Sequence, residues 1–194
     1  MIEQMAQARK GSVAAVSAEG WLAGARVCVS PFCDERPDAA DLSLVVIHGI
    51  SLPPGQYGGP YIEQLFTGRL DPDAHPYFAG IHQLKVSAHL LIRRDGSVIQ
   101  YVPFTRRAWH AGVSRWQARE RCNDFSIGIE LEGSDEEAYA LAQYAALAAA
   151  LRALLAAYPR LSRAGIVGHS DIAPGRKTDP GPYFDWARLR ADLE

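Results

Sequence analysis

The segment FSIGIELEG, residues 125–133, alternates branched aliphatic side chains with glycine and glutamate. Successive side chains of an extended strand point to opposite faces of a sheet. One face of this segment therefore carries the aliphatic side chains at positions 127, 129 and 131, as a buried core face does. The other face carries Glu130 and Glu132. The segment predicts a strand with one face in the core and two carboxylates on the other face, where they are either solvated or line a cleft.

Three other segments carry strand signals, and together they predict a sheet around this central strand. The β-branched run at 42–51 has the pattern of a buried strand. Residues 88–103 predict two strands joined at Asp95-Gly96, which is a strong hairpin signal. A further short strand is expected at 164–170.

The clearest helix is predicted from about 135 to 158. Ser134 and Glu137 form a capping box at its start, its interior is rich in alanine and leucine, and Pro159 ends it. A closing helix is expected at 183–194. Strands combined with a long helix predict an α/β (α+β) fold in which helices pack on a sheet.

Length and composition limit the class of protein. A chain of 194 residues is long enough to bury one core and is expected to form a single domain. A net charge of −2 gives no electrostatic reason to expect binding to nucleic acid or to an anionic membrane. The three cysteines are an odd number, which favours a reducing compartment over a disulfide framework.

The N-terminal segment lacks the features of an export signal. Its longest apolar run, VAAV, is too short for a secretory signal or a membrane span. We assign residues 1–18 to a flexible tail and residues 19–194 to the folded domain, and we expect the protein to be cytoplasmic. The region 52–80 is rich in turn-forming residues, with a possible short helix at 60–67, and a loop this long is usually functional.

Two histidines and an aspartate are the candidate metal ligands. His48 and His169 each lie at or near the end of a predicted strand, where sites on open sheets collect. Asp179 precedes Pro180, which restricts its backbone to extended geometry. Imidazole and carboxylate groups are good zinc ligands, and three protein ligands with one open position define a catalytic zinc site. Each histidine also has a simpler interpretation, as a hydrogen-bonded structural residue.

Glu130 and Lys177 are the candidate catalytic residues beside such a metal. A zinc ion lowers the pKa of a bound water to about 7, and Glu130 could then act as the general base. Lys177 lies two residues before Asp179, and its ammonium could stabilise an oxyanion that develops on a carbonyl. The remaining histidines carry less weight, although one of them, His110, follows a tryptophan that could line a cleft. They are His75, His82, His89 and His110.

Several blocks of the sequence resemble a known family, and they run in order from about Trp21 to the C-terminus. They include VVIHGISLPPGQYGGPYIEQLFTG, VSAHLLIRRDGSVIQYVPFTRRAWHAGVS, RERCNDFSIGIELEG and GHSDIAPGRKTDPGPYFDWARL. These blocks are similar to the AmpD-type 1,6-anhydro-N-acetylmuramoyl-L-alanine amidases. That family belongs to the zinc amidase superfamily, which also contains the peptidoglycan recognition proteins.

The resemblance implies a fold, a reaction and a set of site residues. The fold is a mixed central sheet flanked by helices, and the reaction is zinc-dependent hydrolysis of the amide between anhydro-muramic acid and L-alanine of muropeptides in cell-wall recycling. One Zn²⁺ per chain is implied, with a small-molecule muropeptide as substrate and no obligate protein partner. The metal ligands are His48, His169 and Asp179, and the catalytic pair is Glu130 and Lys177.

The resemblance also implies three substrate-binding residues and two departures from the family. Trp109 lines the cleft near the sugar, while Lys85 and Arg121 meet carboxylates of the stem peptide. Gly49 stands where an asparagine is common, and Lys85 stands where arginine is familiar, which replaces a bidentate group by a point charge.

Three other functions remain open at this stage. The first is a non-catalytic muropeptide-binding module of the same fold, although such a module could lose a ligand or the lysine and this chain keeps all of them. The second is an exported amidase that acts on the intact cell wall. The third is a protein stabilised by structural zinc, which would need a fourth protein ligand.

Overall fold

The computed structural model describes residues 15–194, and most of the tail assigned to residues 1–18 lies outside that range. Val16 forms an isolated antiparallel bridge with Leu22. A six-stranded mixed sheet forms the centre of the fold. In spatial order its strands are β1 (Arg26–Val27), β5 (Val98–Gln100), β4 (Leu90–Ile92), β9 (Ser126–Glu132), β3 (Leu44–Ile50) and β10 (Ile166–Gly168).

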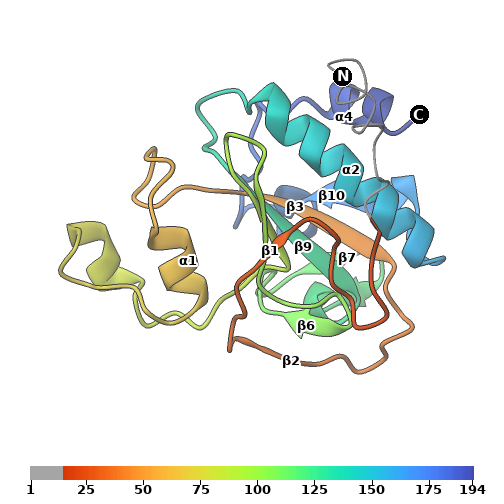
Figure 1. Ribbon diagram of the computed structural model, residues 1–194, viewed down its shortest axis with the longest axis horizontal. Coiled ribbons are helices and arrows are strands. Elements are labelled where there is room, and N and C mark those ends of the chain that lie inside the picture. The colour runs from red at the N-terminus through yellow and green to blue at the C-terminus, as the bar shows by residue number, and fades with distance from the viewer. Residues whose placement is uncertain (1–14) are drawn as a thin grey trace, which may run out of the picture.

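Helices and short strand pairs surround this sheet (Figure 1). The helices are α1 (Tyr61–Phe66), α2 (Leu141–Ala157), α3 (His169–Ile172) and α4 (Trp186–Asp192), with 3₁₀ turns η1 (Pro76–Gly80), η2 (Cys122–Asp124) and η3 (Arg163–Gly165). The two small antiparallel ribbons pair β2 (Cys33–Glu35) with β6 (Arg106–Ala108) and β7 (Arg115–Trp116) with β8 (Arg119–Glu120). The predicted fold class, a mixed central sheet flanked by helices in one domain, is confirmed.

The predicted strands are all present. The hairpin at Asp95-Gly96 joins β4 and β5, which pair antiparallel with Leu91 opposite Ile99. Gly96 has a φ of +83°, a conformation that a residue with a Cβ rarely adopts. The turn is closed by a hydrogen bond of 2.8 Å from the Gly96 N–H to the Arg93 carbonyl. The short helix considered at 60–67 is α1.

The predicted start of the long helix at 135 is wrong, because α2 begins at Leu141. Ser134 accepts a hydrogen bond from the Glu136 N–H two residues later, at 3.3 Å, and so closes a turn instead of capping a helix. Gln143 supplies the cap, since its Oε1 accepts from the Ala140 N–H at 3.0 Å. Its amide nitrogen donates to the carbonyls of Ile92 and Glu132, so α2 starts where it can be tied to β4 and β9.

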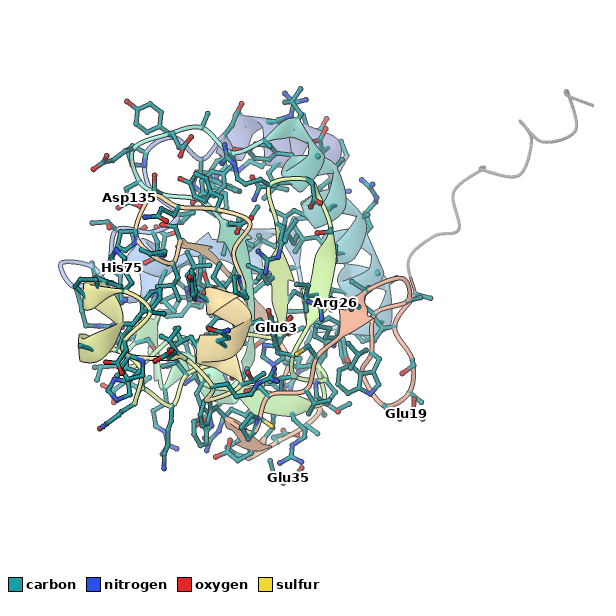
Figure 2. The ribbon with its side chains drawn as sticks, turned by 60° about the vertical axis from the view of Figure 1, so that its left-hand side comes forward. Glu19, Arg26, Glu35, Glu63, His75 and Asp135 are labelled. Carbon is teal, nitrogen blue, oxygen red and sulfur yellow. The ribbon has the colours of Figure 1, made fainter. Side chains whose placement is uncertain are left out.

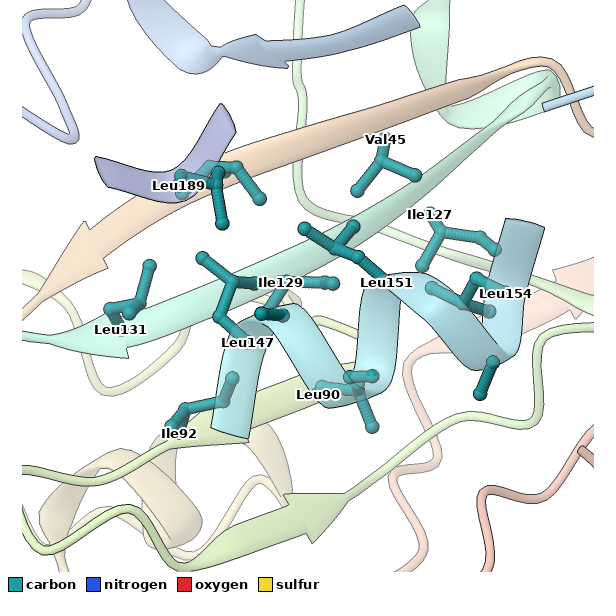
Figure 3. Close-up of a cluster of buried hydrophobic side chains, with 14 of the residues drawn as sticks. Val45, Leu90, Ile92, Ile127, Ile129, Leu131, Leu147, Leu151, Leu154 and Leu189 are labelled. Carbon is teal, nitrogen blue, oxygen red and sulfur yellow. The ribbon is translucent and has the colours of Figure 1, made fainter. Parts of the chain in front are cut away.

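Helix α2 covers one face of the sheet. Its side chains Leu147, Leu151 and Leu154 are fully buried against the aliphatic residues of β3, β4 and β9, as Figure 3 shows. The alternation in 125–133 is confirmed here, because the side chains at positions 127, 129 and 131 all lie in this core.

A second apolar cluster covers the opposite face. Helix α1 contributes Ile62, Leu65 and Phe66, which pack with Leu91 of β4 and its neighbours. Figure 2 shows α1 in front of the sheet, where Glu63 lies beside Arg26 of β1 with 2.5 Å between Oε2 and Nη2.

The cysteines Cys28, Cys33 and Cys122 carry free thiols.

The described part of the chain contains no helix that combines the length and the apolar character needed to cross a membrane.

The α2 core yields a prediction about stability. Leu151→Ala removes a fully buried side chain and is expected to lower the free energy of unfolding by about 2–5 kcal/mol. Leu141→Ala is the matched control, because Leu141 begins the same helix and is 65% exposed, and it should cost less than about 0.5 kcal/mol. Urea unfolding followed by circular dichroism measures both, and equal losses would show that α2 does not pack as described.

Candidate metal centre and active site

Parallel strand pairing brings the candidate residues to one edge of the sheet. β9 and β10 both run parallel to β3, so their carboxyl ends meet at this edge. The register places His48 directly opposite Glu130. Gly168 lies opposite Ile47, so His169, the next residue, comes level with His48. The strand predicted at 164–170 ends at Gly168, and His169, predicted at or near the strand end, is the first residue of α3.

Asp179 reaches the same edge from the loop that follows α3. The Ser170 N–H donates to the Asp179 carbonyl at 3.0 Å, which holds this loop against the start of α3. The hydroxyl of Tyr139 donates to the Pro180 carbonyl at 2.9 Å. Gly168 permits the close approach, because a Cβ at that position would lie 2.9 Å from Cδ of Pro180.

The three candidate ligands form a triangle of donor atoms. His48 Nδ1 lies 2.9 Å from His169 Nδ1, and Asp179 Oδ2 lies 3.2 Å from the first nitrogen and 3.1 Å from the second. Hydrogen bonds cannot serve all three sides, because each Nδ1 has at most one proton and an ionised carboxylate has none. Neighbouring ligands of tetrahedral zinc are about 3.3 Å apart, as follows from bonds of about 2.0–2.1 Å. The donor set therefore fits a small divalent cation.

The protonation states agree with this fit. Burial lowers the pKa of His48 to about 4, although the hydrogen bond with Asp179 acts to raise it. Burial alone would raise the pKa of Asp179, but hydrogen bonds with His169 and His48 hold it below its usual range. A neutral imidazole and an ionised carboxylate are the forms that bind metals.

The two carboxylates of β9 have different surroundings. Glu132 pairs with Arg93 at 3.1 Å and accepts a hydrogen bond of 2.7 Å from the Gly58 N–H, so it holds the 52–60 loop. Glu130 is buried, and its Oε2 has no hydrogen-bond partner among residues 15–194. Burial raises the pKa of Glu130 well above its usual range, the charge of Asp179 acts in the same direction, and Lys177 opposes both. Glu130 is thus the carboxylate that is free to act on a ligand.

A cleft of about 560 Å³ opens over this edge of the sheet. Its wall includes the predicted ligands, both predicted catalytic residues and one predicted substrate contact: His48, His169, Asp179, Glu130, Lys177 and Trp109. The structure therefore brings six of the eight predicted site residues together.

The other two predicted residues lie outside this lining. Lys85 is exposed, although its neighbours Leu84 and Val86 do line the cleft. The side chain of Arg121 is 73% exposed, lies 3.3 Å from Asp124, and borders two neighbouring hollows. One of these hollows shares Arg176 with the cleft. The roles of Lys85 and Arg121 stay predictions.

His110, which carries little weight on sequence grounds, lies in direct contact with a candidate metal ligand. Its Nδ1 lies 2.9 Å from Nε2 of His48. A signal for it was present in the strand that carries Glu130, because Gly128 lies on the same face. A Cβ at Gly128 would come within 2.4 Å of the His110 ring, so the glycine makes room for the imidazole.

Comparison with known proteins places this site in a family. The sequence profile of the N-acetylmuramoyl-L-alanine amidases matches residues 38–182. The 1,6-anhydro-N-acetylmuramyl-L-alanine amidase AmpD of Citrobacter freundii is 65% identical over 173 residues, which are 89% of this chain and 92% of that protein.

Solved structures agree with the sequence comparison. The crystal structure of a selenomethionine AmpD derivative has a TM-score of 0.89 and 63% identity, and the match covers 92% of this chain and 99% of that one. The Escherichia coli amidase AmiD, in complex with anhydro-N-acetylmuramic acid-L-Ala-D-gamma-Glu-L-Lys, has a TM-score of 0.59 and 29% identity, covering 91% of this chain and 65% of that one. With its sequence profile, its fold and its cleft all in agreement, the chain belongs to the N-acetylmuramoyl-L-alanine amidase family.

Proposed function

We propose that this chain is a zinc-dependent amidase that hydrolyses the bond between 1,6-anhydro-N-acetylmuramic acid and L-alanine of muropeptides. The observation that carries the proposal is the ligand triangle of His48, His169 and Asp179, with the unpaired Glu130 in the same cleft of the described chain. The names of the relatives at 55–65% identity support the choice of substrate.

His48, His169 and Asp179 would hold one Zn²⁺ ion per chain. Two neutral imidazoles and one carboxylate leave a divalent cation with a net positive charge. When bound, zinc supplies Lewis acidity, which polarises a carbonyl and makes a coordinated water acidic near neutral pH. A fourth protein ligand is not needed for this role, since three ligands leave a position for the substrate or solvent.

Glu130 and Lys177 would carry out the proton transfer and the charge stabilisation. Glu130 would take a proton from the attacking water as the new C–O bond forms. It would then deliver this proton to the leaving nitrogen of L-alanine as the C–N bond breaks. Lys177 is exposed at the cleft wall, where its ammonium can meet the negative charge that develops on the carbonyl oxygen. Lys177 also favours the ionised form of Glu130, which a base requires.

Trp109, Lys85 and Arg121 would bind the substrate. Trp109 offers an aromatic surface in the cleft, against which a sugar ring can pack. Lys85 and Arg121 would meet carboxylates of the stem peptide from beyond the cleft lining. We further propose that the reaction takes place in the cytoplasm, during recycling of cell-wall fragments.

The reaction is tested directly by mass spectrometry. Incubation of the zinc-loaded protein with an anhydro-muropeptide should release anhydro-N-acetylmuramic acid and a free peptide that begins with L-alanine. Removal of the metal with a chelator should stop the reaction, because the cation polarises the carbonyl, and added zinc should restore it. If the substrate stays intact with both the zinc-loaded and the chelator-treated protein, the chain is a muropeptide-binding module and not an amidase. Cleavage that persists without metal would exclude the zinc mechanism.

Substitution of Glu130 tests the general base. Glu130→Gln should lower kcat by about 10²–10⁴-fold, because the amide cannot accept the proton, while zinc stays bound. Glu132→Gln is the matched control on the same strand face: it should lower the thermal unfolding temperature, since it weakens the pair with Arg93, and change kcat far less. Steady-state kinetics and metal analysis of both variants measure this difference, and full activity of Glu130→Gln would remove its assigned role.

A pair of lysine substitutions separates catalysis from binding. Lys177→Ala should lower kcat by about 10²–10³-fold with little change in KM, because its charge stabilises the transition state. Lys85→Ala should raise KM and leave kcat nearly unchanged, because its charge meets a remote part of the substrate. The assignment of Lys177 fails if its removal acts only on KM.

A further inference from the structure

The far nitrogens of both candidate histidine ligands are held by two consecutive residues. Nε2 of His48 lies 2.9 Å from Nδ1 of His110. Nε2 of His169 lies 3.2 Å from the carbonyl oxygen of Ala111. Since both contacts are made from one dipeptide, a shift of that dipeptide would move both imidazole rings.

The dipeptide itself is clamped by a single side chain. Oδ1 of Asn123, in η2, accepts hydrogen bonds from the N–H groups of His110 and Ala111, at 3.1 and 2.8 Å. Arg176 adds a second hold, since its Nη2 donates to the Ala111 carbonyl at 2.7 Å. The space cleared by Gly128 admits the His110 ring from the side of β9.

Hydrogen-bond directions follow from the chemistry of these groups. A carbonyl only accepts, so His169 must carry its proton on Nε2, which leaves the lone pair on Nδ1 for a metal. For His48 to offer Nδ1 in the same way, its Nε2–H must donate to Nδ1 of His110. His110 then carries its own proton on Nε2, which lies 3.2 Å from the Ser126 hydroxyl oxygen. The reverse direction would place a proton on His48 Nδ1 and prevent ligation.

We propose that His110–Ala111, clamped by Asn123, is a positioning segment that fixes the tautomer and ring orientation of both histidine ligands. This inference rests on the proposed zinc site. His110 acts through its acceptor nitrogen on His48, and Ala111 acts through its carbonyl on His169. Partners of this kind orient a ligand before the metal arrives, and their loss typically weakens metal binding by about 10–100-fold.

Variants at His110 separate hydrogen bonding from packing. His110→Leu fills the space but cannot accept from His48, and it should raise the zinc dissociation constant by about 10–100-fold. His110→Asn keeps an acceptor oxygen near the place of Nδ1 and should recover most of that affinity. Asn123→Ala keeps both histidine ligands and His110 but removes the two hydrogen bonds that hold the backbone of His110 and Ala111. It should also weaken zinc binding. His82→Leu is the control, because His82 bonds only to the nearby carbonyls of Phe78 and Ala79 within the described chain.

Zinc affinity of the purified full chain is measured by competition with a chromophoric chelator, and thermal unfolding of the apoprotein shows whether each variant is folded. The zinc site is established if the unsubstituted protein binds zinc tightly and Asp179→Ala abolishes this binding. If the unsubstituted protein does not bind zinc, the proposed function fails together with the inference. If the site is established and His110→Leu binds zinc as tightly as the unsubstituted protein, the inference is overturned while the proposed function stands. If His110→Leu does not fold, Asn123→Ala decides, and unchanged affinity in that variant overturns the inference.

Discussion

Parallel pairing of β3 with β9 and β10 is the constraint on which the site depends. This pairing sets His48 opposite Glu130 and brings His169 level with them, although these residues are far apart along the chain. Strands in a sheet lie about 4.8 Å apart, a spacing that suits side chains meeting around one small ion. The remaining ligand, Asp179, needs only a short loop that packs back against the start of α3.

One face of the sheet contributes mainly to stability, and the other face carries the candidate active site. The face under α2 is aliphatic and fully buried, and among the described residues it contains no candidate site residue. The opposite face is apolar beneath α1 and polar at the carboxyl ends of the strands. Because the polar edge is supported from below by a packed core, its side chains have few alternative positions, as a preorganised site requires.

Much of this arrangement could be predicted from particular residues. The alternation in 125–133 identified the core face and the carboxylate face, and Asp95-Gly96 identified the hairpin. The sequence could not show which of Glu130 and Glu132 has an ion-pair partner. The partner of Glu132 is Arg93, which follows the neighbouring strand β4 and lies far from Glu132 in the sequence. Nor could it place the start of α2. Ser134 and Glu137 match the sequence pattern of a capping box, whereas the contacts that tie Gln143 to Ile92 and Glu132 on the sheet are tertiary. His110 is undervalued by the sequence because its importance lies in the atoms that it faces. Gly128 indicates a space on the face of β9 that carries Glu130, but it does not indicate which side chain fills that space.

The alternation of aliphatic and acidic side chains along β9 limits which sequence changes this strand can accept during evolution. Glu130 and Glu132 share one face and the core aliphatics share the other, so inserting or deleting one residue in this strand would exchange the two faces for every strand residue beyond that point. A single event of that kind would bury the carboxylates under α2 and expose the aliphatic side chains to the cleft, ending folding and turnover together. The length of this strand is therefore more tightly constrained than the identity of its aliphatic residues, which can be exchanged for others of similar size.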